Sequence, residues 1–206
     1  MVTDSMVQRV DAVVPILILA AGQGRRLGRI KALAPWTDGT LLDDAVQRAK
    51  QASSCVLAAV GAGDPLVRFR TGNRPTCWCP VPRWSEGQSR ALKTGLSCLP
   101  IRSSWPGVII MLVDQPLIPA SHLQVLVTRA RAAPQEAVAT LANGRCMAPA
   151  YLPRRLWPEV FALNGDRGAG GILNAIGAEV VACEAAGQDI DTRAELLRAR
   201  AGLLGA

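Results

Sequence analysis

The chain has 206 residues, 50% of them hydrophobic, and its 23 Lys and Arg residues against 16 Asp and Glu give a net charge of +7. This length and composition are typical of one domain that needs no disulfide or metal to support its core. The apolar run from Val13 to Ala21 is too short to span a membrane and lacks a signal-peptide pattern. We therefore expect a soluble, cytoplasmic protein with a single domain over residues 1–206, in which residues 1–11 form a flexible N-terminus.

Residue counts exclude several kinds of site. A single histidine, His122, rules out a His-rich zinc site. The six cysteines include no CxxC pair, so neither a zinc ribbon nor a thioredoxin-like site is indicated. Basic residues are spread along the chain without a long run, which argues against nucleic-acid binding. Most of them are arginines, which suit recognition of phosphate groups on a small ligand.

Hydrophobic periodicity predicts strands that alternate with helices. The predicted strands are 13–20, 55–61, 107–113 and 179–183, together with a hairpin of 137–141 and 147–151 around Asn143-Gly144. The predicted helices are 41–52, 88–99, 119–133, 168–176 and 192–200, with a further helix starting near Asp64. Residues 70–82 contain Pro, Gly and Cys and are expected to be irregular. This order predicts an α/β protein, a three-layer α/β/α Rossmann-like fold with a mainly parallel sheet.

Three polar segments directly follow predicted strands: 22–31, 114–116 and 189–192. Ligands of open α/β sheets bind at the carboxyl ends of the strands, so we expect these segments to meet. The first segment combines glycines, whose backbone N–H groups can face phosphate oxygens, with the cations Arg26 and Lys31. A Rossmann dinucleotide motif is disfavoured because its third glycine comes one residue late, and a Walker A loop is absent.

The other two segments carry carboxylates. Asp114 ends a strand opposite the cationic loop, where it could hold Mg²⁺ against phosphates. Asp189 and Asp191 flank Ile190, so on an extended segment both carboxylates would face the same side, and one could complete the metal site. Alternatively, Asp191 caps the last helix.

At these residues the chain resembles a known family. Residues 19–33, LAAGQGRRLGRIKAL, are similar to the nucleotide loop LAAGxGxRxGxxK of the MobA-like NTP transferases. The resemblance extends to the molybdenum cofactor cytidylyltransferase branch through WSEGQSRALKTGL (84–96), DQP (114–116), GDRGAG (165–170) and DIDTRAEL (189–196). These motifs follow the family order over most of the chain.

The resemblance implies transfer of CMP from CTP to the terminal phosphate of molybdopterin, with release of pyrophosphate and with Mg²⁺ as cofactor. It implies a nucleotide site formed by Leu19, Ala20, Ala21, Gly22, Gly24, Arg26, Lys31 and Gly87. Lys31, Arg26 and Asp114 would be catalytic, Asp114 and Asp191 would bind the metal, and Trp84, Asp166, Arg167 and Gly168 would contact the acceptor. A recipient molybdoenzyme or its chaperone is a further expected partner, whereas nucleic acid and membranes are not.

The chain departs from the family pattern at four positions. Ala91 replaces a usual Ser, Gly170 a usual Arg, Ile30 a usual Pro and Glu195 a usual Asp. The first two changes are expected on the acceptor side. The alternatives are therefore GTP as the nucleotide, another phosphorylated acceptor, a non-catalytic cofactor carrier, and a dinucleotide-dependent oxidoreductase.

Overall fold

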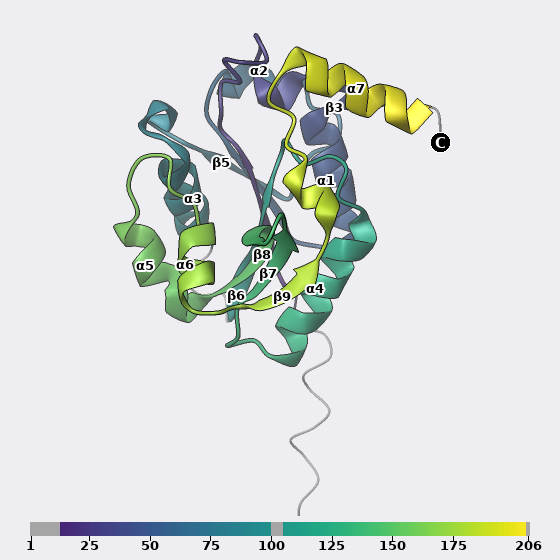
Figure 1. Ribbon diagram of the computed structural model, residues 1–206. Helices are drawn as coiled ribbons and strands as arrows, with labels where there is room; N and C mark the ends of the chain where they lie inside the picture. Colours follow the sequence, from purple (N-terminus) through teal and green to yellow (C-terminus); the bar gives the residue numbers. More distant parts are fainter. Residues whose placement is uncertain (1–12, 100–104, 205–206) are drawn as a thin grey trace, which may run out of the picture.

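A computed structural model describes residues 13–99 and 105–204 (Figure 1). Its strands are β1 (Ile16–Ala20), β2 (Pro35–Trp36), β3 (Gly39–Thr40), β4 (Val56–Val60), β5 (Cys77–Pro80), β6 (Gly107–Leu112), β7 (Val138–Ala142), β8 (Arg145–Pro153) and β9 (Glu179–Ala182). Its α-helices are α1 (Leu41–Ala52), α2 (Asp64–Arg70), α3 (Gln88–Ser97), α4 (Ala120–Ala132), α5 (Trp157–Ala162), α6 (Gly170–Ala175) and α7 (Arg193–Leu204). The expected flexible N-terminus, residues 1–11, lies outside the described residues.

Seven strands form one sheet in the order β5-β4-β1-β6-β8-β7-β9. All neighbouring pairs are parallel except those of β8, which is antiparallel to both β6 and β7. Strands β2 and β3 form a separate antiparallel pair. The predicted three-layer fold with a mainly parallel sheet is therefore confirmed. No helix in the described part of the chain has the length and apolar character needed to cross a bilayer.

The alternation of side chains along β1 divides the core into two layers. Ile16 and Ile18 pack with residues of α1 and α4 on one face of the sheet, and Leu17 and Leu19 pack with residues of α3, α5 and α6 on the other. Figure 1 shows these two groups of helices on opposite sides of the strands. Because β1 is buried on both faces, its sequence is continuously apolar rather than alternating.

Local sequence signals fix several element boundaries. Helix α1 starts with a capping box in which Thr40 and Asp43 satisfy each other's backbone N–H groups, and it has the predicted bounds. The predicted hairpin is formed by β7 and β8, with Asn143 and Gly144 both at positive φ as a tight turn requires. The order of the predicted strands and helices is thus confirmed, with ends shifted by a few residues.

The expectation of irregular structure over residues 70–82 is wrong at residues 77–80, whereas residues 71–76 form neither helix nor strand. Residues 77–80 form β5, which pairs with β4 from Leu57↔Cys77 to Val60↔Pro80. An edge strand tolerates proline because one side of its backbone needs no partner, and the pairing comes from the distant β4 rather than from local pattern. Helix α5 was not predicted either; it is short and has a proline in its first turn.

The single histidine is a buried structural residue. His122 of α4 contacts Thr140 of β7, with 2.7 Å between His122 Nε2 and Thr140 Oγ1. Thr140 Oγ1 donates its proton to the Pro149 carbonyl at 2.6 Å, so it must accept from His122 Nε2–H. Burial lowers the pKa of His122 below its ordinary value of 6.5.

This burial makes folding stability depend on pH. The folded protein binds fewer protons at His122 than the unfolded chain below pH about 6.5, so this residue destabilises the fold as the pH falls through that value. We expect the free energy of unfolding of the wild type, relative to His122→Gln, to decrease between pH 7.5 and 5.5 in urea titrations. The glutamine amide can still donate to Thr140 but does not titrate.

The difference between the two proteins is the quantity to compare. Asp189, whose pKa is raised to about 6 by burial and by Asp114, titrates in the same range with the opposite sign, and it does so in both proteins. A pH-independent difference would contradict the assignment of a buried, neutral His122.

Candidate active site

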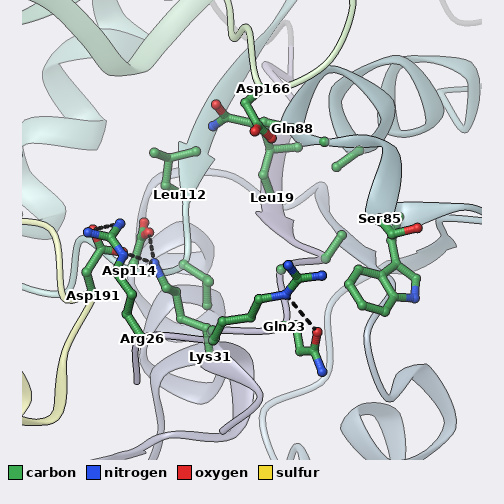
Figure 2. Close-up of a pocket in the computed structure, with 18 residues that line it drawn as sticks. Leu19, Gln23, Arg26, Lys31, Ser85, Gln88, Leu112, Asp114, Asp166 and Asp191 are labelled. Carbon is green, nitrogen blue, oxygen red and sulfur yellow. Dashed lines mark hydrogen bonds and ion pairs between the residues drawn. The ribbon is translucent and has the colours of Figure 1, made fainter. Parts of the chain in front are cut away.

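The three polar segments meet at the carboxyl ends of β1 and β6, as the sequence predicts. They line a pocket of about 430 Å³. Figure 2 shows Arg26, Lys31, Asp114 and Asp191 together at one side of this pocket, with Ser85 at the opposite side. The full lining is Leu19, Ala21, Gly22, Gln23, Gly24, Arg25, Arg26, Lys31, Trp84, Ser85, Gly87, Gln88, Ala91, Leu112, Val113, Asp114, Asp166 and Asp191.

Lys31 is the centre of the charged side of the pocket. Its Nζ donates to Asp114 Oδ2 at 2.6 Å and to Asp191 Oδ1 at 2.7 Å. Arg26 Nη2 donates to Asp191 Oδ2 at 2.6 Å. The Lys31 and Asp114 side chains are only 14% and 17% exposed, whereas Arg26 is 73% exposed. An ion-pair cluster thus extends from a largely buried ammonium group to a solvent-exposed guanidinium.

The ion pairs favour the charged forms of Lys31 and Asp191. Burial works to lower the pKa of Lys31, but the charge of Asp114 and the hydrogen bonds to both carboxylates outweigh it, so this pKa is raised. Burial works to raise the pKa of Asp191, yet the hydrogen bonds and charges of Lys31 and Arg26 outweigh it and hold this pKa below its ordinary value. Cationic and anionic groups therefore face each other inside one pocket.

Backbone hydrogen bonds fix the position of the carboxylates. The N–H of Ile190 donates to the carbonyl of Asp114 at 2.8 Å, which attaches the segment before α7 to the end of β6. Ile190 itself is buried in the core layer of α1 and α4. Asp114 and Asp191, more than 70 positions apart in the sequence, thereby become neighbours, because the buried side chain of Ile190 anchors the segment that carries Asp191.

The donor atoms fit a hard divalent cation. Asp114 lines the pocket, and its Oδ1 is buried and makes no hydrogen bond within the described structure, so this carboxylate has an oxygen with an unused lone pair. Two carboxylates supply the oxygen ligands that Mg²⁺ or Mn²⁺ prefers, while phosphates and water commonly complete such a site. Among the described residues no group of three or more His, Cys, Asp or Glu side chains is placed to hold a metal alone.

Glycines bring the backbone close to the pocket at two places. Gly24 has φ +67°, and a Cβ there would overlap the carbonyl oxygen of Arg29. Gly87 has φ +106°, and a Cβ there would lie 2.5 Å from the Gly165 carbonyl group. Glycine is needed at both positions because the left-handed conformation and the close approach each disfavour a side chain.

Most of the predicted site residues lie in the pocket, with three exceptions. Ala20 is buried in the opposite core layer, so its side chain does not reach the pocket. Gly168 lines an adjoining hollow of about 260 Å³ rather than the main pocket. Arg167 is exposed and lines neither of the two.

The two open questions about the 189–192 segment have structural answers. Asp189 lines a separate hollow beside α7 and is not part of the Lys31 pocket, so the expectation that both carboxylates face one site is wrong. Residues 188–191 form no regular strand and the chain bends at Thr192 to enter α7, so the alternation of an extended strand does not apply here. The helix is capped by Thr192, whose hydroxyl accepts from Glu195 N–H at 3.2 Å, and not by Asp191.

Sequence reasoning missed several polar residues of the pocket. Gln88 is the first residue of α3, and Figure 2 places its amide beside Asp166. Ser85 and Gln23 also line the pocket. Their position in the sequence could have indicated them, because Ser85 and Gln88 lie in the motif over residues 84–96 and Gln23 lies in the glycine-rich loop after β1. Ala91, expected on the acceptor side, lines the main pocket, whereas Gly170 lines the adjoining hollow.

Curated relatives cover most of the chain. The purine catabolism protein PucB of Bacillus subtilis (strain 168) is 29% identical over an alignment of 200 positions, which covers 87% of this chain and 92% of PucB. The nicotine blue oxidoreductase of Paenarthrobacter nicotinovorans is 28% identical over an alignment of 198 positions, which covers 88% of this chain and 94% of that protein. One of these two relatives is thus named for purine catabolism and the other for a redox reaction.

Solved structures share the fold. Rv0371c from Mycobacterium tuberculosis H37Rv has a TM-score of 0.78 at 25% identity and matches 95% of this chain and 99% of its own. A manganese complex of the same protein has a TM-score of 0.75 at 21% identity, with 92% and 99% covered. The model of the MobA-like NTP transferase domain matches residues 16–180, a range that holds the pocket except for Asp191. The chain belongs to the MobA-like NTP transferase family.

Proposed function

We propose that the protein is a Mg²⁺-dependent cytidylyltransferase that transfers CMP from CTP to the terminal phosphate of molybdopterin and releases pyrophosphate. The observation that carries this proposal is the cluster of Lys31, Asp114, Asp191 and Arg26, which lines the same pocket as the glycine-rich loop after β1. Nucleotidyl transfer needs positioning and charge neutralisation more than a general base, because a phosphate nucleophile is already ionised. A site without histidine is suited to such a reaction.

The charged side of the pocket is assigned to the triphosphate. Lys31 and Arg26 supply ammonium and guanidinium donors that pair with phosphate oxygens, and the backbone of Gly22 and Gly24 lets the chain approach them closely. Asp114 and Asp191 would hold Mg²⁺, which when bound supplies charge neutralisation for the phosphates. The manganese complex of the related Rv0371c supports the choice of a divalent cation.

The uncharged side is assigned to the acceptor. The adjoining hollow is lined by apolar residues, glycines, Gln88 and Cys146, and no charged side chain lines it. Gln88 and Leu19 line both spaces, so a molecule in the hollow would reach the main pocket beside Asp166. In the proposed step, an acceptor phosphate oxygen forms a bond to the α-phosphorus of CTP, and the bond from that phosphorus to the β-phosphate oxygen breaks.

The preference for CTP rests on the resemblance at the nucleotide loop. The LAAG form is similar to the CTP-using branch and the LAGG form to the GTP-using branch, and the two differ at Ala21. Ala21 lines the pocket, which supports a role for this position in nucleotide choice. The absence of an Arg at Gly170 and of a Ser at Ala91 leaves another phosphorylated acceptor as the nearest alternative.

A second candidate function comes from one relative. Because a protein 28% identical over 88% of this chain is named nicotine blue oxidoreductase, a redox reaction in the same pocket is the competing hypothesis. It predicts oxidation of a reduced nicotinamide dinucleotide and no release of pyrophosphate. The late third glycine of the loop argues against it, because the dinucleotide motif requires closer spacing.

Pyrophosphate release tests the proposed function directly. We expect release when molybdenum-loaded molybdopterin and Mg²⁺ are supplied with CTP, and at most background release with GTP, ATP or UTP. Release with GTP alone would keep the reaction and contradict the base assignment. Consumption of NADH or NADPH without pyrophosphate release from any nucleotide would favour the oxidoreductase, and nucleotide binding without turnover would favour a carrier.

Substitution of two aspartates separates the metal site from its surroundings. Asp114→Asn should lower turnover about 100-fold or more, since it replaces a charged oxygen ligand next to Lys31 with a neutral amide. Asp64→Asn is the matched control, because Asp64 pairs with Arg68 on α2, lines none of the three hollows and should leave turnover within about threefold of the wild type. Circular dichroism checks that both variants fold. Equal losses in the two variants would contradict the assignment of Asp114.

A further inference from the structure

Glu195 makes an unusual set of contacts for a residue that lies outside the pocket. Its Oε2 accepts the backbone N–H of Asp191 at 2.9 Å and that of Thr192 at 2.8 Å. The hydroxyl of Thr192 accepts the N–H of Glu195 in return. This is a capping box that reaches one residue further back than usual, to the residue that carries the pocket carboxylate.

The contacts of Asp191 explain why this reach matters. Within residues 13–99 and 105–204, its side chain is held by Lys31 and Arg26, the two cations assigned to the triphosphate. When those cations turn to phosphate oxygens, the side-chain contacts of Asp191 are given up. Its backbone is then fixed by two attachments, the Ile190 N–H to Asp114 carbonyl bond on one side and Glu195 on the other.

We infer that Glu195 is a positioning residue of the reaction centre, which holds the backbone of Asp191 so that its carboxylate stays opposite Asp114 while Lys31 and Arg26 exchange partners. Glu195 acts through Asp191 and touches neither substrate nor cation. This inference rests on the proposed function, because it needs the pair Asp114 and Asp191 to receive a divalent cation. It goes beyond that function by giving a role to a residue that lines the hollow beside α7 instead of the main pocket.

The chain contains a matched control for this role. Helix α1 begins with a capping box of the same kind, in which Asp43 Oδ2 accepts the N–H of Thr40 at 3.0 Å and Thr40 Oγ1 accepts the N–H of Asp43 at 3.1 Å. Neither residue lines the pocket. Loss of this cap should lower stability as loss of the Glu195 cap does, without moving a metal ligand.

The test measures Mn²⁺ affinity in the presence of a non-hydrolysable CTP analogue, using electron paramagnetic resonance of free Mn²⁺ on the full-length protein. Glu195→Ala should weaken Mn²⁺ binding about tenfold or more, the scale seen when a residue that orients a metal ligand is removed. Glu195→Gln should stay within about threefold of the wild type because the amide oxygen still accepts both N–H groups. Asp43→Ala should lower the melting temperature while leaving Mn²⁺ affinity unchanged.

Each other result contradicts the inference. Wild-type affinity in Glu195→Ala would show that Asp191 needs no such support. Equal weakening in Asp43→Ala would show that general loss of stability, not position, is measured, and failure of Glu195→Gln to restore binding would exclude the hydrogen bonds as the cause. A wild type that binds no Mn²⁺ even with the analogue would contradict the proposed function itself, and with it this role.

Discussion

One ammonium group holds the pocket together. Lys31 Nζ lies 2.6 Å from an oxygen of Asp114 and 2.7 Å from an oxygen of Asp191, so it joins the loop after β1, the end of β6 and the segment before α7. Two carboxylates this close would repel each other without a cation between them. Lys31 therefore keeps both carboxylates in place. A divalent cation that binds together with an anionic ligand can replace these ion pairs, because the cation can take over the two carboxylates and the anionic ligand can take over Lys31.

The rest of the fold can be understood as support for this contact. The parallel strands β1 and β6 are neighbours in register, so their carboxyl ends bring the loop and Asp114 together. Ile190 anchors the third segment because its side chain is buried in the core. The charged cluster and the uncharged hollow then lie next to each other across Leu19 and Gln88. That asymmetry fits the proposed pair of substrates, with a triphosphate on the charged side and the acceptor on the uncharged side.

The sequence predicted the parts of this structure that local chemistry determines. A strand buried on both faces is continuously apolar, and apolar residues at helical spacing indicate an amphipathic helix, so the sequence predicts β1 to within three residues and α1 with its observed bounds. The meeting of the loop with Asp114 and Asp191 was also predictable, because strand ends share one edge of a parallel sheet. The resemblance to a known family pointed to the same residues independently.

What the sequence could not give depends on contacts between distant residues. Strand β5 forms because it pairs with β4, and its short sequence of Cys, Trp and Pro has no pattern that predicts a strand. The separation of Asp189 from Asp191 depends on the irregular path of residues 188–191, which simple alternation along a strand does not describe. Likewise, Glu195 looked like a minor departure from the family pattern until its contacts with the Asp191 backbone were seen.

The most direct test of the account is a crystal structure of the protein with Mn²⁺ and a non-hydrolysable CTP analogue, with the metal located by its anomalous scattering. The account predicts an anomalous peak within coordination distance of both Asp114 and Asp191, with Lys31 Nζ moved from the carboxylates to a phosphate oxygen. A peak away from these two residues, or a Lys31 that keeps both ion pairs while the nucleotide is bound, would contradict it.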